Sequence, residues 1–200
     1  MKPGSFFAFI HRIGYINRWG LMRNTSYKNL KEHSYDVAVI AQGLALIGNA
    51  KFNKNYDVNR ITSAAMFHDV NEALTGDLPT PVKYANKDIE TAYKKIEADA
   101  VNNILMMQDE IIKDKYVEYF NPSAEDKLII KAADKISGFI KCKEEKDRSN
   151  KDFDKAYNSL KKSIENSDLP EVKYFIKNML PHYNLILDEF LEWSVSKTEI

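Results

Sequence analysis

Residues 57–83 read DVNRITSAAMFHDVNEALTGDLPTPVK, and this stretch decides the fold class. Apolar residues recur in its first half at the three- and four-residue spacing of an amphipathic helix, behind Asp57, a residue type that often caps helix N-termini. The pattern predicts one helix that begins at Asp57 and stops near residues 75–76, where a glycine follows. Pro79 and Pro81 then predict a stiff connecting loop that stays out of helix.

Helical spacing recurs along the rest of the chain, and strand alternation is almost absent. The predicted helices cover approximately residues 5–16, 30–47, 86–107, 110–119, 123–140, 153–164 and 170 onward, with a break at Pro181 in the last. We therefore expect an all-α bundle that forms one domain over residues 1–200, in which C-terminal helices pack on a core of about residues 5–145. The charged run KCKEEKDRSNKDFDK at 141–155 is expected to be a solvated helix end and loop.

The charge balance excludes several classes of function. The 200 residues carry 29 Lys+Arg and 29 Asp+Glu, whereas binding to long nucleic acid or to an anionic membrane requires an excess of basic charge. The single cysteine, Cys142, excludes an internal disulfide and fits a reducing compartment. No apolar run approaches the roughly 18 residues that span a bilayer, and basic residues interrupt the N-terminus before a signal-peptide core can form. We expect a cytoplasmic protein.

A group of histidines and acids suggests a metal site. In the helix predicted from Asp57, His68, Asp69 and Glu72 project from one side, where burial of acids is costly unless a cation compensates. His33 begins the apolar stripe of another helix, and Asp134 lies within the apolar run LIIKAADKISGFI. Solvent exposure of the acid pair and a salt bridge from Asp134 to a lysine are the simple alternatives. The other reading is that two histidines and two aspartates bind one divalent ion; such a mixed donor set favours Co, Mn, Fe or Ni over Zn or Mg.

Two further features suit phosphate chemistry. The chain uses 24 Lys but five Arg, three of them within the first 23 residues, and Arg18 stands beside Trp19. A guanidinium binds phosphate through a bidentate fork and Trp supplies a rigid apolar wall, although a cation–π or surface pair is an equal alternative. The proline-rich loop presents Asp77, Thr80 and Lys83 near the presumed metal. This loop either positions a substrate or simply connects two helices.

Several short motifs now stand together in one order. They are INRW at 16–19, LMRN at 21–24, EHS at 32–34, HD at 68–69 with Glu72, TGDLPTPVK at 75–83, and Asp134. In this combination the sequence closely resembles the 5'-deoxynucleotidase group of HD-domain metal-dependent phosphohydrolases. The match is dense over residues 5–84 and resumes at about 134–144.

The resemblance implies an HD-domain helical fold and hydrolysis of deoxyribonucleoside 5'-monophosphates to deoxyribonucleosides and phosphate. It implies that one divalent metal ion is bound by His33, His68, Asp69 and Asp134, that the substrate is a small nucleotide, and that the protein forms a homodimer. Arg18 would orient the phosphate, and Trp19 would crowd the sugar 2' position. The implied catalytic residues are Glu72, Asp77 and Arg18, and the implied substrate-binding residues are Arg18, Trp19, His33, Asp69, Asp77, Leu78, Pro79, Thr80, Lys83 and Asp134.

Two alternatives remain open beside this reading. The first is another HD-type chemistry, by a nucleotide phosphodiesterase or a triphosphohydrolase. The second is a non-catalytic module that senses nucleotides without turning them over. Glu72 and Asp77 are both available to transfer protons, and the sequence does not decide which acts as acid and which as base.

Overall fold

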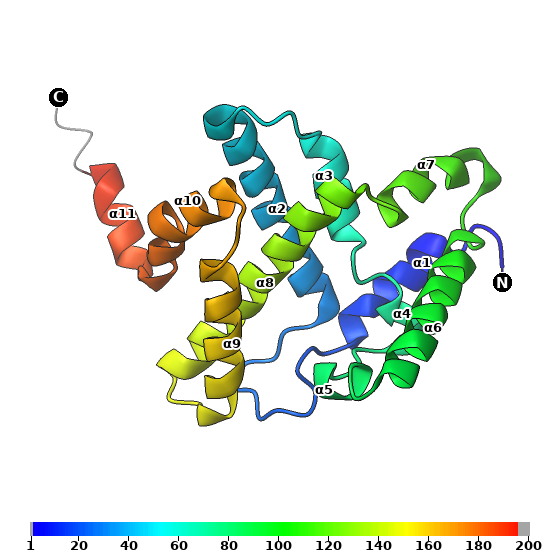
Figure 1. The fold of residues 1–200 in the computed structure, drawn as a ribbon, viewed down its shortest axis with the longest axis horizontal. Coiled ribbons are helices and arrows are strands. Elements are labelled where there is room, and N and C mark those ends of the chain that lie inside the picture. The colour runs from blue at the N-terminus through cyan, green and yellow to red at the C-terminus, as the bar shows by residue number, and fades with distance from the viewer. Residues whose placement is uncertain (1, 196–200) are drawn as a thin grey trace.

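The computed structural model describes residues 2–195 of the chain. Within this range every named element is a helix, and the one extended pairing is an isolated antiparallel bridge between Asn17 and Asn29. The elements, drawn in Figure 1, are α1 (Phe6–Ile10), the 3-10 helix η1 (His11–Tyr15), α2 (Leu30–Phe52), α3 (Val58–Met66), α4 (Glu72–Thr75), α5 (Thr80–Lys83), α6 (Lys87–Leu105), α7 (Glu110–Phe120), α8 (Ala124–Asp147), the 3-10 helix η2 (Lys151–Phe153), α9 (Asp154–Glu165), α10 (Pro170–Asn178), the 3-10 helix η3 (Leu180–Asn184) and α11 (Leu187–Val195). The prediction of an all-α fold is confirmed.

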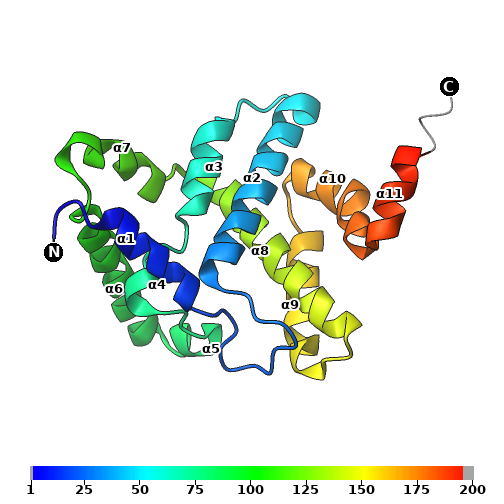
Figure 2. The same cartoon turned by 180° about the vertical axis from the view of Figure 1, so that it is seen from behind.

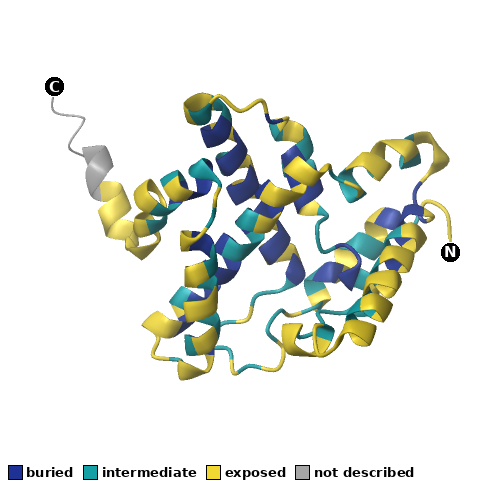
Figure 3. Cartoon of the chain, viewed as in Figure 1, coloured by how far each residue is buried: buried dark blue, intermediate teal, exposed yellow. Residues whose placement is uncertain are grey.

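The two longest helices, α2 and α8, pack against each other at the centre of the molecule, as both views in Figures 1 and 2 show. Each buries apolar residues about one helical turn apart, and burial of one such Leu or Ile side chain is worth about 1.5–3 kcal/mol. These residues are Val37, Ala41 and Leu44 on α2, and Ile129, Ala133 and Ile136 on α8. Helices α3, α9 and α10 contribute to the same core, and its buried positions line the facing sides of these helices in Figure 3.

A smaller apolar cluster fastens the N-terminal helix to the turn after α3. Phe6 on α1 and Val70 in that turn are buried together with Ile104 and Met107 at the end of α6. The backbone amide of Phe6 donates to the carbonyl of Met107 at 3.2 Å. The turn that carries His68 and Asp69 is therefore packed from the side of α1 and α6.

The prediction of one continuous helix over residues 57–75 is wrong. Helix α3 ends at Met66, and a series of tight turns leads to the short helix α4. The amide of Val70 bonds to the carbonyl of Phe67, and that of Glu72 to the carbonyl of Asp69, both at 3.0 Å. A continuous helix would point neighbouring side chains about 100° apart. The turn instead lets His68 and Asp69 face each other, with Nε2 and Oδ2 3.1 Å apart.

Other boundaries also differ from those predicted. The helix expected over residues 5–16 is α1 followed by a tighter 3-10 turn, and the loop expected over 76–83 contains the one-turn helix α5, because Pro81 is tolerated in the first turn of a helix. The expected break at Pro181 is confirmed by the separation of α10 from α11.

The expectation of a solvated run over residues 141–155 is wrong for four of its members. Lys141, Cys142, Glu145 and Phe153 are 2%, 0%, 0% and 0% exposed, and the loop between η1 and α2 packs over this end of α8.

The C-terminal helices differ in how they pack. Helix α10 lies against α2, whereas α11 extends away from the body of the molecule and exposes Leu187, Phe190 and Leu191 (Figure 1). Among the described residues, no helix is both long enough and apolar enough to span a bilayer.

Candidate active site

The predicted metal ligands come together from three places in the fold. His33 lies in the second turn of α2, His68 and Asp69 lie in the turn after α3, and Asp134 lies in the middle of α8. His33 Nε2 is 3.1 Å from Asp134 Oδ1 and 3.6 Å from Asp69 Oδ2. Ligand atoms of His33, His68 and Asp134 all lie within 4.8 Å of one another. Packing of α2 against α8 thus joins residues that are about a hundred positions apart in the sequence.

The two imidazole rings present their Nε2 atoms to this centre. His68 Nδ1 lies 2.8 Å from the carbonyl of Ala65, which requires Nδ1 to carry the proton and to donate it. His33 Nδ1 lies 3.2 Å from the hydroxyl of Ser137. Both Nε2 atoms are buried and make no hydrogen bond. A buried nitrogen without a hydrogen bond is costly, and a metal ion bound by its lone pair would satisfy it. The donor set fits a divalent ion.

Electrostatics at the centre favour the ligand forms of most of these groups. Burial lowers the pKa of His33, which keeps this ring neutral. Burial alone would raise the pKa of Asp134, but the close approach of His33 and the charge of His68 lower it. For Asp69, His68 and Arg18 likewise outweigh burial and lower the pKa. Burial opposes protonation of His68, but Asp69 and Asp134 raise its pKa to about 9. A proton therefore competes with any cation for the Nε2 lone pair of this ring.

Arg18 is part of the same cluster. Its Nη1 lies 2.6 Å from Asp69 Oδ2, and its Nη2 lies 3.8 Å from Asp134 Oδ1. Burial opposes its charge, but Asp69, Asp134, Glu72 and Asp77 together raise its pKa. The alternative of a surface or cation–π pair for Arg18 is wrong. The ion-pair partner of Asp134 outside the histidines is this arginine, and not the lysine of the simple alternative.

Glu72 opens α4 and faces the cluster. It is 9% exposed, and its Oε2 has no hydrogen-bond partner. Burial first, and then the neighbouring charges of Asp69 and Asp77, raise its pKa to about 9. A carboxyl group with so high a pKa holds its proton near neutral pH and can donate it as a general acid, and a cation bound beside it would lower this pKa.

Asp77 and Trp19 are held together by a hydrogen bond. The backbone amide of Trp19 donates to Asp77 Oδ2 at 3.2 Å, and the side chain of Asn24 donates to the Trp19 carbonyl at 3.1 Å. Trp19 has a φ of 59°, a left-handed conformation that is strained for a bulky residue and that these bonds stabilise. Its ring lies 5.5 Å from that of Phe153.

The remaining loop residues make no recorded bond to the cluster. Lys83 Nζ donates to Glu97 Oε1 at 2.5 Å and stands 5.0 Å above the ring of Tyr93, both on α6. Thr80 is exposed at the start of α5, and the connecting residues Leu78 and Pro79 are half-buried.

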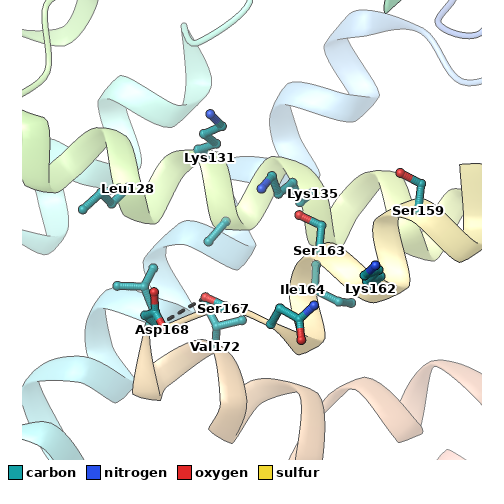
Figure 4. A pocket seen from close by; sticks show the side chains of 13 residues that line it. Leu128, Lys131, Lys135, Ser159, Lys162, Ser163, Ile164, Ser167, Asp168 and Val172 are labelled. Carbon is teal, nitrogen blue, oxygen red and sulfur yellow. Dashed lines mark hydrogen bonds between the residues drawn. The ribbon is translucent and has the colours of Figure 1, made fainter.

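One cavity on the surface reaches the cluster. A cavity of about 540 Å³ is bounded by His68 and Asp134 together with residues of α3, α7 and α8. A larger one, about 670 Å³, lies between α8, α9 and the start of α10, away from these residues (Figure 4). The buried residues that line it are the apolar Ile164 and Val172. We assign no function to it.

Sequence reasoning missed two residues that shape the site. Ser137 orients His33, and its position one turn after Asp134 on the same helix was the available signal. Phe153 supports Trp19 across more than 130 residues of chain, and the sequence holds no signal for that contact.

Comparisons with known proteins agree with this geometry. The family model for the YfbR-like 5'-deoxynucleotidases matches residues 5–183. The chain belongs to this family. A family relative from Vibrio atlanticus, a 5'-deoxynucleotidase, is 42% identical over 192 residues, which cover 94% of this chain and 99% of the relative.

Solved structures agree on the fold. An HD-domain phosphohydrolase from Listeria innocua, 24% identical, superposes with a TM-score of 0.77 over 90% of this chain and 88% of its own. The HD phosphohydrolase DatZ of cyanophage S-2L, 21% identical, superposes with a TM-score of 0.58 over 82% of this chain and 88% of its own, and its structure holds dA and one catalytic zinc ion. At these identities both comparisons support the HD fold of the family member described here.

Proposed function

We propose that this protein removes the 5'-phosphate from deoxyribonucleoside 5'-monophosphates, giving a deoxyribonucleoside and inorganic phosphate, with one divalent metal ion held by His33, His68, Asp69 and Asp134. One observation carries the proposal: two unpartnered histidine nitrogens face two aspartates beside an arginine, in a chain that matches the family over almost its whole length. A 5'-deoxynucleotidase that is 42% identical supports the substrate class.

The donor chemistry limits the choice of metal. Two imidazoles with two carboxylates form a mixed nitrogen–oxygen set, which favours Co, Mn, Fe or Ni, whereas zinc is the ion found in the DatZ structure. When bound, such an ion supplies a Lewis acid that polarises the phosphate and makes water more acidic. Ser137 and the Ala65 carbonyl hold the two rings in place for this role.

Arg18 is the proposed phosphate-binding residue. Its guanidinium is fixed beside Asp69 and keeps its charge under four surrounding carboxylates. A planar guanidinium donates two parallel hydrogen bonds to a phosphate and stabilises the negative charge that develops on its oxygens during in-line attack. The neighbouring acids keep the arginine in this place before the substrate arrives.

Glu72 is the proposed proton-transfer residue. Asp77 already accepts the Trp19 amide through Oδ2, whereas Glu72 Oε2 is buried without a partner and remains free to take or give a proton. We therefore assign proton transfer in the reaction to Glu72. Asp77 fixes the Trp19 backbone, and with Leu78, Pro79 and Thr80 it is the proposed contact for the nucleoside part of the substrate.

Trp19 is the proposed discriminator between sugars. Its indole is held in a strained backbone conformation next to Arg18 and against Phe153. A rigid ring at the sugar 2' position admits hydrogen but collides with a hydroxyl, a steric effect that is worth roughly 10- to 200-fold in specificity. We expect that Trp19→Ala raises turnover of ribonucleotides relative to deoxyribonucleotides; an unchanged ratio contradicts the steric role.

We further propose a homodimer in the cytoplasm. Tyr35, Val39 and Leu46 form an exposed apolar row on α2, which a second copy would cover. The one cysteine, Cys142, is a buried free thiol, and burial raises its pKa to about 12. Such a thiol is unreactive, and its free state fits a reducing compartment. Light scattering of the purified protein tests the dimer.

A phosphate-release assay tests the activity. Purified protein is loaded with Co or Mn and given deoxyribo- and ribonucleoside mono-, di- and triphosphates side by side. Release from deoxyribonucleoside monophosphates alone is expected. Release from triphosphates favours another HD chemistry, as does cleavage of a nucleotide phosphodiester in a parallel assay, and nucleotide binding without any turnover favours a sensing module. An Asp69→Ala preparation excludes a contaminating phosphatase.

A further inference from the structure

Beneath the loop that carries Arg18 and Trp19 lies a second buried ion pair, between Lys141 and Glu145 on α8. The two side chains are 2% and 0% exposed. Neither Lys141 nor Glu145 is among the described residues that line the proposed site, and no step of the proposed reaction uses them. A buried ion pair adds little net stability, so its presence in a core asks for another reason, such as the choice of one conformation.

Glu145 collects hydrogen bonds from the loop. One of its oxygens accepts the backbone amide of Thr25 at 3.0 Å and the Thr25 hydroxyl at 2.7 Å, and the other accepts the amide of Ser26 at 3.3 Å. Asn150 bridges the same two elements, with its side chain 2.8 Å from Glu145 and 2.7 Å from the carbonyl of Arg23. The segment that follows Trp19 is thus bonded at several points to the end of α8.

Lys141 completes the connection. Its ammonium group donates to the carbonyl of Ser26 and to Glu145, and it stands 5.5 Å from the ring centre of Phe153. Phe153 is fully buried, and its other neighbour is the indole of Trp19 at 5.5 Å. A continuous row of contacts therefore runs from the ion pair through Phe153 to Trp19.

We infer that Glu145 and Phe153 are positioning residues for Trp19, and that through Trp19 they set the discrimination between deoxyribose and ribose. Glu145 fixes the path of the loop, and Phe153 fixes the face of the indole. Neither residue touches the proposed metal ligands in any recorded contact. The inference rests on the proposed function, because it concerns the sugar that the same site accepts.

The test compares two buried phenylalanines. Phe153→Leu removes the ring under Trp19, and Phe175→Leu makes the same change in the main core, where Phe175 is 6% exposed and lies far along the chain from the loop. The readout is kcat/KM for a deoxyribonucleoside monophosphate divided by that for the matching ribonucleotide. We expect Phe153→Leu to lower this ratio by about 10-fold and Phe175→Leu to leave it unchanged.

Glu145→Gln provides a second, polar test. The substitution keeps the size of the side chain but replaces one of its two acceptor oxygens with an NH2 donor, so some of the donors of Thr25 and Ser26 lose their acceptor. Its matched control is Glu171→Gln, since Glu171 is also 0% exposed and accepts a hydrogen bond from Tyr56 at 2.8 Å in the core. We expect the sugar ratio to fall in Glu145→Gln and to stay at the wild-type value in Glu171→Gln.

Two further measurements separate positioning from loss of stability. In a Trp193→Phe background Trp19 is the remaining tryptophan, and its emission should shift in Phe153→Leu but not in Phe175→Leu. In a Trp19→Ala background, Phe153→Leu should change the sugar ratio no further, because its effect acts through Trp19.

The outcomes are distinguishable. An active, selective wild type whose ratio is unchanged in Phe153→Leu, or changes as much in Phe175→Leu, overturns this inference and leaves the proposed function standing. An unchanged Trp19 emission also overturns it. A metal-loaded wild type that releases no phosphate from any deoxyribonucleotide overturns the proposed function and the inference with it.

Discussion

Two clusters of buried charge flank the loop over residues 16–29, and they differ in how fully they are satisfied. In the first, around Asp69 and Asp134, two histidine nitrogens and one oxygen of Glu72 have no hydrogen-bond partner. In the second, both oxygens of Glu145 accept several hydrogen bonds and Lys141 donates to two acceptors. Several unsatisfied groups gathered at one place are what a bound ligand would complete, whereas a satisfied cluster holds the fold.

The largest expected effect breaks the first cluster. Asp69→Ala removes a proposed metal ligand and the partner of Arg18, so we expect loss of bound metal and a fall in kcat/KM of at least about 10³-fold. Metal content per chain and phosphate release measure the two effects. Stability of the metal-free protein should change less than in variants of the second cluster. Retention of full metal content contradicts the ligand role of Asp69.

Glu72→Ala separates binding from chemistry within the first cluster. The substitution removes the carboxyl that has an unpartnered oxygen but none of the proposed metal ligands. We expect metal content to remain at the wild-type level while kcat falls by about 10²- to 10⁴-fold, the usual contribution of a general acid or base. Full turnover in this variant would sink the assignment of proton transfer to Glu72.

Glu145→Ala breaks the second cluster. It leaves the ammonium of Lys141 buried without its carboxylate and deprives Thr25 of its acceptor, and removal of one partner of a buried pair costs about 3–5 kcal/mol. Urea unfolding of the metal-free protein measures this loss. Metal content should be kept in the folded fraction. A loss of metal with unchanged stability would reverse the roles assigned to the two clusters.

These differences explain how much the sequence could predict. The helices were predictable because apolar spacing and capping residues act locally, as at Ser123, whose hydroxyl accepts the amide of Asp126. The composition of the cluster of His33, His68, Asp69 and Asp134 was predictable, since a carboxylate such as Asp134 within an apolar run requires a partner. The break after Met66 could not be predicted, because it depends on how the turn that carries His68 and Asp69 packs against residues distant in the sequence.

The second cluster was hidden for a different reason. A run rich in Lys, Glu and Asp normally lies in solvent, and nothing within residues 141–155 marks Lys141 and Glu145 as buried. Their partners Thr25 and Ser26 are more than a hundred residues away. Burial of these charges is set by the loop that covers them, and a single sequence does not show which loop that is.

The smallest expected effect is on the pH dependence of the unfolding free energy, and it concerns the charge of Glu145 in the second cluster. Burial alone would raise the pKa of Glu145, but hydrogen bonds from Lys141, Asn150 and Thr25 lower it far below its ordinary value. A carboxyl whose pKa is lowered by folding stabilises the protein above its unfolded pKa of about 4.3, and this contribution is lost as the pH falls toward the folded value.

The difference in unfolding free energy between wild type and Glu145→Gln should therefore be largest near about pH 7 and should shrink below about pH 4. Urea midpoints of the metal-free proteins at a series of pH values measure it. Other acids titrate equally in both proteins and cancel in the difference, so the slope belongs to Glu145. Glu171→Gln is the matched control, because that buried carboxyl accepts a single recorded hydrogen bond, from Tyr56, and lacks a lysine partner among its recorded contacts. A pH-independent difference for Glu145→Gln would mean that the hydrogen bonds of its carboxylate, and not its charge, hold the loop in place.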